Sequence, residues 1–75
     1  MEFNEFLTKF AEQFDDTDVS KIQISTVFQD IDEWSSLTSL GVIALAKTEY
    51  GKTITGSELR ACVTVGDVFN LINNK

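Results

Sequence analysis

Histidine, proline and cysteine are missing or scarce in this chain of 75 residues, and each shortage excludes a class of structure or chemistry. The absence of histidine removes His-dependent catalytic triads, His-zinc sites and imidazole acid–base catalysis. With no proline and four glycines, turn-rich all-β folds and proline-rich linkers are disfavoured. Cys62 is the only cysteine, so no internal disulfide can form, and its apolar surroundings predict a buried structural thiol.

Positive charge is also in short supply. Six basic residues face twelve acidic ones, which gives a net charge of −6 and an isoelectric point near 4.3. Nine of the twelve acidic residues lie before residue 35. A chain of this sign is repelled by phosphate backbones and anionic membrane surfaces, so we expect no nucleic-acid or membrane partner, and partners with basic patches instead.

Long hydrophobic runs are absent as well. No apolar segment approaches the roughly 20 residues that span a bilayer, and residues 1–5 lack the pattern of a signal peptide. We therefore expect a cytoplasmic protein. A chain of this length buries only about 60% of its unfolded surface, which leaves no room for a deep reaction chamber. We expect one monomeric domain over residues 1–75 that is not itself an enzyme.

Apolar spacing predicts a first helix over about residues 2–14. Its one-sided stripe consists of Phe3, Phe6, Leu7, Phe10 and Phe14. Residues 15–33 show no steady period and predict a long, ordered connection with a short helical turn, held by Phe28 and Ile31. Asp15-Asp16-Thr17-Asp18 lacks the glycine and glutamate of a calcium-binding loop, so we interpret it as an exposed acidic turn.

A second helix is predicted over about residues 37–50. Ser35 and Ser36 are favourable residues to cap its start, and Gly51 ends it. One apolar line, assigned to the core, comprises Val42, Ile43, Ala46 and Tyr50. A second line comprises Leu37, Leu40, Gly41 and Ala44. The second line is either a docking face for a partner or the contact of a helix that is covered on two sides.

The remaining residues predict two more helices. Residues 51–56 form a turn, and residues 57–61 form a short third helix. Thr64 and Asp67 have the spacing of a capping box that opens a last helix, with Val65, Val68, Phe69 and Ile72 facing inward. The predicted fold is all-α, a small four-helix bundle with a long loop between the first two helices and a short third helix.

Four segments together resemble the acyl carrier protein family over nearly the whole chain. They are Trp34-Ser35-Ser36-Leu37, Glu49-Tyr50-Gly51, Ile54 and Thr64-Val65-Gly66-Asp67. In that family, a serine in an Asp-Ser-Leu triplet carries a covalent 4'-phosphopantetheine arm that originates from coenzyme A. The resemblance implies that Ser36 is this serine, because leucine follows it. It also implies that a phosphopantetheinyl transferase and acyl-loading or acyl-transferring enzymes are the partners, and that cargo is held as a thioester.

The chain departs from the family pattern at two places. Ser35 stands where the family has aspartate, so an alternative is a carrier-fold interaction domain that has lost the arm. The predicted second helix contains one acidic residue, whereas many family members have several there. We therefore expect apolar partner contacts from Leu37, Leu40 and Ala44. The negative guide for partners is predicted from the connection, at Asp30, Asp32 and Glu33. A solvated acidic loop with no partner is the alternative.

Overall fold

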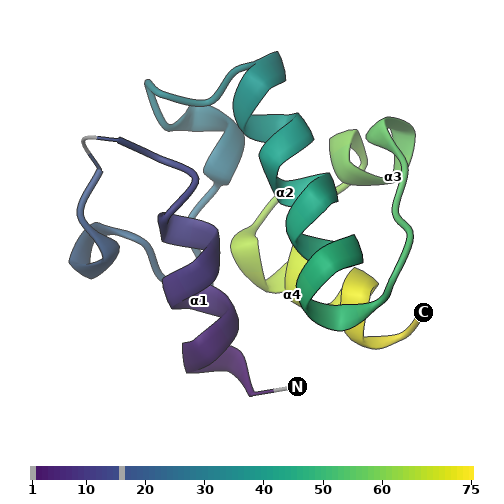
Figure 1. Ribbon diagram of the computed structural model, residues 1–75. Coiled ribbons are helices and arrows are strands. Elements are labelled where there is room, and N and C mark those ends of the chain that lie inside the picture. Colours follow the sequence, from purple (N-terminus) through teal and green to yellow (C-terminus); the bar gives the residue numbers. More distant parts are fainter. Residues whose placement is uncertain (1, 16) are drawn as a thin grey trace.

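The computed structural model describes residues 2–15 and 17–75, and these residues form four α-helices and no strand (Figure 1). The helices are α1 (Phe3–Ala11), α2 (Ser36–Tyr50), α3 (Gly56–Arg60) and α4 (Val65–Asn73). Two short 3₁₀ turns, η1 (Val19–Lys21) and η2 (Phe28–Asp30), lie between α1 and α2. The predicted all-α class is confirmed for these residues. None of the described helices has the length and apolar character that crossing a membrane requires.

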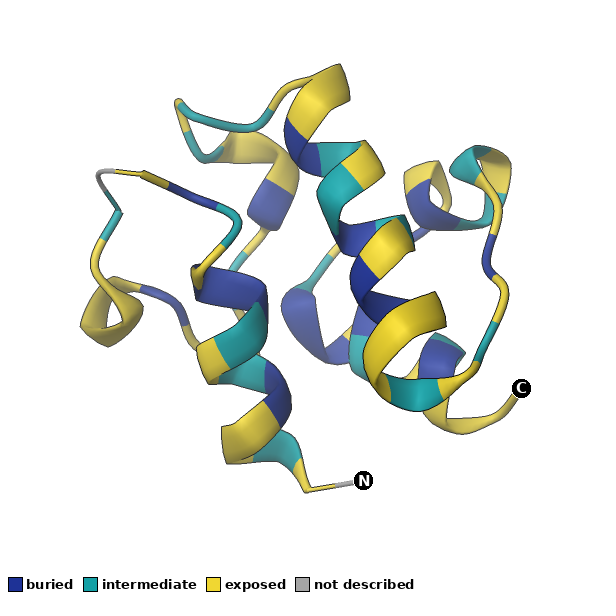
Figure 2. Cartoon of the chain, viewed as in Figure 1, coloured by how far each residue is buried: buried dark blue, intermediate teal, exposed yellow. Residues whose placement is uncertain are grey.

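The core lies between α1, α2 and α4 and is rich in aromatic rings. Phe6, Phe10 and Phe28 are completely buried. The ring of Phe28 meets that of Trp34 edge to face, with centroids 4.7 Å apart, and Phe10 and Trp34 lie nearly parallel at 6.5 Å. Such pairs add to the stability that burial of their apolar surface already provides. Figure 2 shows buried residues facing the interior from each helix, while the outer side of α2 is exposed.

Helix α1 is shorter than predicted, ending at Ala11 rather than near residue 14. Beyond it the chain tightens into turns in which Gln13 N donates to Phe10 O and Phe14 N donates to Ala11 O. Acidic residues that follow a helix are unfavourable beside the negative end of its dipole, which agrees with an early end. Phe14 stays buried at 5% exposure because these turns keep it on the core side.

The connection between α1 and α2 is ordered by contacts with α4. The N–H groups of Val65 and Gly66 donate to the carbonyls of Thr26 and Ile24, each at 2.9 Å. An isolated antiparallel bridge links Val27 with Thr64. Residue 24 also explains the glycine at 66, since a Cβ there would lie 2.7 Å from Ile24 Cγ1. These bonds hold the middle of the connection against the start of α4.

The two side chains predicted to anchor the connection both contact the core. Phe28 is fully buried, and Ile31 is partly buried and packs against the core. Ile22, at 2% exposure, is a further anchor that was not predicted. Asp15 and Asp18 are exposed, as predicted for the acidic turn, whereas Asp16 lies outside the described residues.

Helix α2 presents a broader inner face than predicted. Val42 and Ala46 are fully buried as expected, while Ile43 and Tyr50 are only partly buried. The remaining buried residues are Thr38 and Leu45. Because α2 contacts both α1 and α3, the buried surface is not one narrow stripe. Gly51 ends the helix with a φ of 65°, a conformation that other residues rarely adopt.

Capping boxes open both of the last two helices. The predicted box at Thr64 and Asp67 is confirmed at the start of α4. A second box, formed by Thr55 and Glu58, opens α3 one residue earlier than predicted. Val65, Val68 and Ile72 are buried as expected, and Phe69 is partly buried.

Candidate functional site

The two adjacent serines at the start of α2 have different environments. Ser35 is the N-cap, in an extended conformation, and its Oγ accepts a bond from Thr38 N at 3.4 Å. The Thr38 hydroxyl donates to Glu33 O at 2.9 Å, so the contact of 3.2 Å between the two hydroxyls leaves Ser35 as the donor. The hydroxyl of Ser35 is therefore used within the fold.

Ser36 is the first residue of α2 and is exposed. No hydrogen bond to its hydroxyl is found within residues 2–15 and 17–75. Ser39 N donates to Ser35 O at 2.9 Å, which is the first main-chain bond of the helix. The N–H groups of Ser36 and Leu37 precede that bond, and such groups at a helix start lack a partner within the helix. A solvent-accessible hydroxyl and free N–H groups thus occur together at this end of α2.

An apolar ridge continues from Ser36 along the outer side of α2. We define it as Leu37, Leu40 and Ala44. Leu37 is 80% exposed and Leu40 62% exposed, and Ala44 is also exposed. The alternative in which α2 is covered on this side is therefore wrong for the chain on its own. Leucines this exposed are unusual when they occur one turn apart, and they are typical of a surface that meets a partner.

An open groove of about 530 Å³ separates α2 from α3 on one side of the ridge. Its walls include Ser36, Trp34 and Ile43 from one side and Arg60 from α3. Gln29 also lines it, and its amide donates to Cys62 O at 3.0 Å. This donor ties the connection to the end of α3. Nothing in the sequence pattern indicated that Gln29 and Arg60 would lie beside the serine. Arg60 is distant in the chain, and Gln29 belongs to a connection that shows no steady period.

The three acidic residues predicted to guide partners have different positions. The carboxylate of Glu33 accepts bonds from Asp15 N at 2.8 Å and from Thr17 Oγ1 at 2.6 Å. Glu33, near the end of the connection, is thus hydrogen-bonded to residues 15 and 17 near its start. Asp30 and Asp32 are exposed, and neither lines the hollows on the two sides of the ridge. A role for these residues in partner binding remains a prediction.

The Ser36 hydroxyl is not hydrogen-bonded to a base among the described residues. Activation of a serine as a nucleophile requires a base within hydrogen-bonding reach. The chain has no histidine, and no described carboxylate bonds to the Ser36 hydroxyl.

Cys62 follows α3, and its side chain does not line the groove beside Ser36. It is buried, as predicted, and its thiol donates weakly to Glu58 O at 3.5 Å. Burial, with smaller contributions from Asp67 and Glu58, raises the pKa of the thiol and so disfavours the reactive thiolate. Cys62 is a core residue here.

No protein-family model matches the chain, and comparisons with curated proteins and with solved structures also find no match. Functional inference therefore depends on the geometry of the site and on the resemblance in the sequence.

Proposed function

We propose that this protein is an acyl carrier protein that holds acyl or aminoacyl groups as thioesters on a 4'-phosphopantetheine arm attached to Ser36. The observation that carries the proposal is the difference between the two serines. The Ser35 hydroxyl caps α2, whereas the Ser36 hydroxyl is exposed and unbonded within the described residues. Together with the leucine that follows, this favours Ser36 as the attachment residue.

The start of α2 suits a phosphodiester. The unpaired N–H groups and the positive end of the helix dipole favour a phosphate near residue 36. α2 has 15 residues, so its dipole is well developed. The groove between α2 and α3 adjoins Ser36 and offers the arm a surface on which to lie, with Arg60 as its positive group.

The cargo would stay outside the helix core. Rings of Phe6, Phe10, Phe28 and Trp34 fill the space between the helices and contact one another at 4.7–6.5 Å. The partners in this proposal are a phosphopantetheinyl transferase and cytoplasmic enzymes that load and unload the thioester. The carrier performs no bond chemistry itself.

The test is incubation with coenzyme A and a broad-specificity phosphopantetheinyl transferase, followed by the mass of the intact protein. We expect the wild type to gain one phosphopantetheine group, and Ser36→Ala to gain none. Ser35→Ala is the matched control and should still be modified. An unmodified wild type, or equal modification of Ser36→Ala, would contradict the proposal.

A second candidate is a carrier-fold interaction domain without the arm. The exposed leucines of the ridge favour it, as does Ser35 at the place of the family's aspartate. Protein purified from its native cells distinguishes the two. A modified mass supports the carrier, and a uniformly unmodified mass supports the interaction domain.

A further inference from the structure

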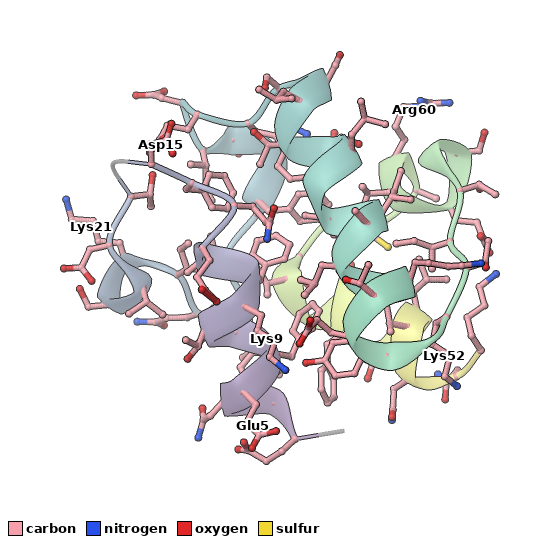
Figure 3. The ribbon with its side chains drawn as sticks, in the orientation of Figure 1. Glu5, Lys9, Asp15, Lys21, Lys52 and Arg60 are labelled. Carbon is pink, nitrogen blue, oxygen red and sulfur yellow. The ribbon has the colours of Figure 1, made fainter. Side chains whose placement is uncertain are left out.

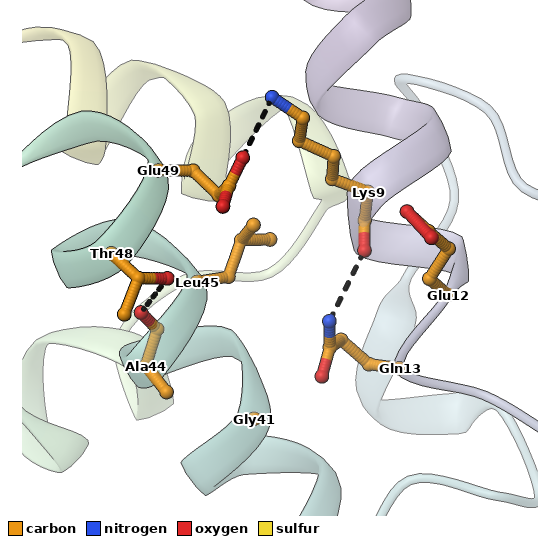
Figure 4. Close-up of a pocket in the computed structure, with 8 residues that line it drawn as sticks. All are labelled: Lys9, Glu12, Gln13, Gly41, Ala44, Leu45, Thr48 and Glu49. Carbon is orange, nitrogen blue, oxygen red and sulfur yellow. Dashed lines mark hydrogen bonds and ion pairs between the residues drawn. The ribbon is translucent and has the colours of Figure 1, made fainter.

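Two hollows lie along the seam between α1 and α2, on the other side of the ridge from Arg60. One has a volume of about 450 Å³ and the other of about 550 Å³, and Glu12, Gln13 and Gly41 line both. Figure 4 looks into the first, where the two helices form opposite walls. The second reaches Leu37 and Leu40 on the ridge. The hollows therefore form one continuous groove, which we call the α1–α2 seam.

Two features of the helices leave the seam open, the early end of α1 and the glycine at position 41. α1 ends at Ala11, before it has covered the first turns of α2. Gly41 contributes no side chain, and the amide oxygen of Gln13 lies where its Cβ would be. Gln13 is fixed in this place, since its Nε2 donates to Lys9 O at 3.2 Å (Figure 4).

Charge differs between the two sides of the ridge. On the seam side, Glu12 and Asp15 are exposed and form no ion pair with any described residue. Lys9 is the only lysine that lines either hollow, and it is paired with Glu49 at 3.1 Å. Lys21 also lies on this side of α2 (Figure 3), but it lines neither hollow. On the opposite side the groove is lined by Arg60. Figure 3 shows Asp15 and Arg60 on opposite sides of α2.

We propose that the seam and the ridge bind an amphipathic helix of a partner protein that carries Lys or Arg along one edge. Its apolar face would cover Leu37 and Leu40, and its basic edge would meet Glu12 and Asp15. A helix is the occupant that suits a groove between two helices. From residue 37 to residue 48, α2 rises about 16 Å, which corresponds to about three turns of the partner.

Charge complementarity fixes the direction in which this helix lies. The leucines would supply most of the affinity, and charges at the edge mainly select orientation and partner. Reversing the partner helix would place its basic edge against Arg60. The proposal does not depend on the arm at Ser36, and it adds Glu12, Asp15 and Gln13 to the residues that meet partners.

The first experiment uses two synthetic helical peptides of about 15 residues, a length at which helices become stable in water. Both carry leucines at i, i+3 or i+4, and i+7. One has lysines along a single edge and the other has glutamates at the same positions. Calorimetry should show that the lysine peptide binds at least about tenfold more tightly. Amide NMR shifts should centre on Gln13, Gly41 and Ala44.

Charge-reversal variants distinguish the effect of the seam carboxylates on peptide affinity from the effect of the protein's net charge. Glu12→Lys with Asp15→Lys should weaken the lysine peptide about fivefold or more. The comparison variant, Asp30→Lys with Asp32→Lys, changes the net charge equally at the two residues predicted to guide partners from the connection. It should weaken this peptide less, because neither residue lines the seam. Leu37→Ala with Leu40→Ala should abolish binding. Ser36→Ala should leave binding unchanged, which keeps this test distinct from the test of the carrier function.

Three results would overturn the proposal. One is an equal loss of affinity in the two charge-reversal variants, because overall charge would then explain binding. Another is a set of NMR shifts centred on the exposed apolar residues Ile24, Val27 and Val63. The third is an equal affinity for both peptides.

Discussion

At the scale of single residues, the hydroxyl at position 35 has a structural task and the hydroxyl at position 36 does not. Ser35 accepts the Thr38 N–H and donates to the Thr38 hydroxyl, which in turn bonds to Glu33 O. This chain of bonds holds the end of the connection against the first turn of α2. The position of Ser36 therefore depends on its neighbour.

Two substitutions at position 35 test this dependence. Ser35→Ala removes the N-cap and should lower the free energy of unfolding by about 1 kcal/mol, measured by urea denaturation. Ser35→Asp keeps a good capping residue and places a carboxylate beside Ser36. It should be about as stable as the wild type and should be modified faster by the transferase.

The two variants must differ in both measurements. Faster modification of Ser35→Ala than of Ser35→Asp would show that the serine in place of aspartate is not what limits recognition. An unchanged stability of Ser35→Ala would show that the capping bond at 3.4 Å contributes little.

At the scale of secondary structure elements, the short helices depend on their caps. α3 has only five residues, and α4 begins at a box in which Asp67 accepts bonds from the N–H groups of Val63 and Thr64, both at 3.0 Å. These backbone bonds, that with Thr64 first, hold the pKa of Asp67 below its ordinary value of 3.8. In α3, the bond with Lys75, followed by that with Thr55, lowers the pKa of Glu58.

The caps predict how stability depends on pH. A carboxylate whose pKa is lower in the folded state stabilises that state above its unfolded pKa, and the contribution is lost as the pH falls through the folded value. The stabilisation from Asp67 should therefore be complete above about pH 5 and disappear as the pH falls below 3.8. Urea denaturation of Asp67→Asn and of the wild type over this range should show the two curves converging in acid.

Thr64→Ser is the control for this measurement, because serine keeps the hydroxyl that accepts the Asp67 N–H and leaves the Asp67 carboxylate in place. Its stability should run parallel to that of the wild type over this pH range. If Asp67→Asn also ran parallel, the α4 cap would not be a source of acid sensitivity.

Local patterns predicted the elements well and their mutual contacts poorly. The spacing of apolar residues located α1, α2 and α4, and the Thr64 box marked the start of α4 to the residue. The short α3 was also expected, one residue later than it begins. Leu45 was missed because α2 is covered from more than one direction, so a single stripe does not describe its inner face. The bonds from Val65 and Gly66 to the connection leave no local pattern, since their partners lie about forty positions earlier in the chain.

The sequence likewise identified some residues of the candidate site and did not predict the contacts of others. Ser36 and the exposed leucines were identified from the start of a helix and a spare apolar line. The engagement of Glu33 with Asp15 and Thr17 was not, because a carboxylate in a loop has the same appearance in sequence whether it bonds to the protein or faces water.

At the scale of the whole molecule, the core behaves as one unit that encloses Cys62. The thiol is 8% exposed, and burial raises its pKa. We expect the native protein to react slowly with a thiol reagent, and the rate to rise in parallel with urea-induced unfolding measured by Trp34 fluorescence. Rapid reaction of the native protein would show that the end of α3 opens locally, without unfolding of the rest.

The pairing of the connection with the first residues of α4 also has a consequence for biosynthesis. Residues 24 and 26 find their main-chain partners only at positions 66 and 65. While the ribosome is still translating the earlier part of the gene, those partners do not yet exist or remain inside the exit tunnel. The nascent chain should therefore stay unfolded until the start of α4 has left the exit tunnel, and then acquire its structure in a single step.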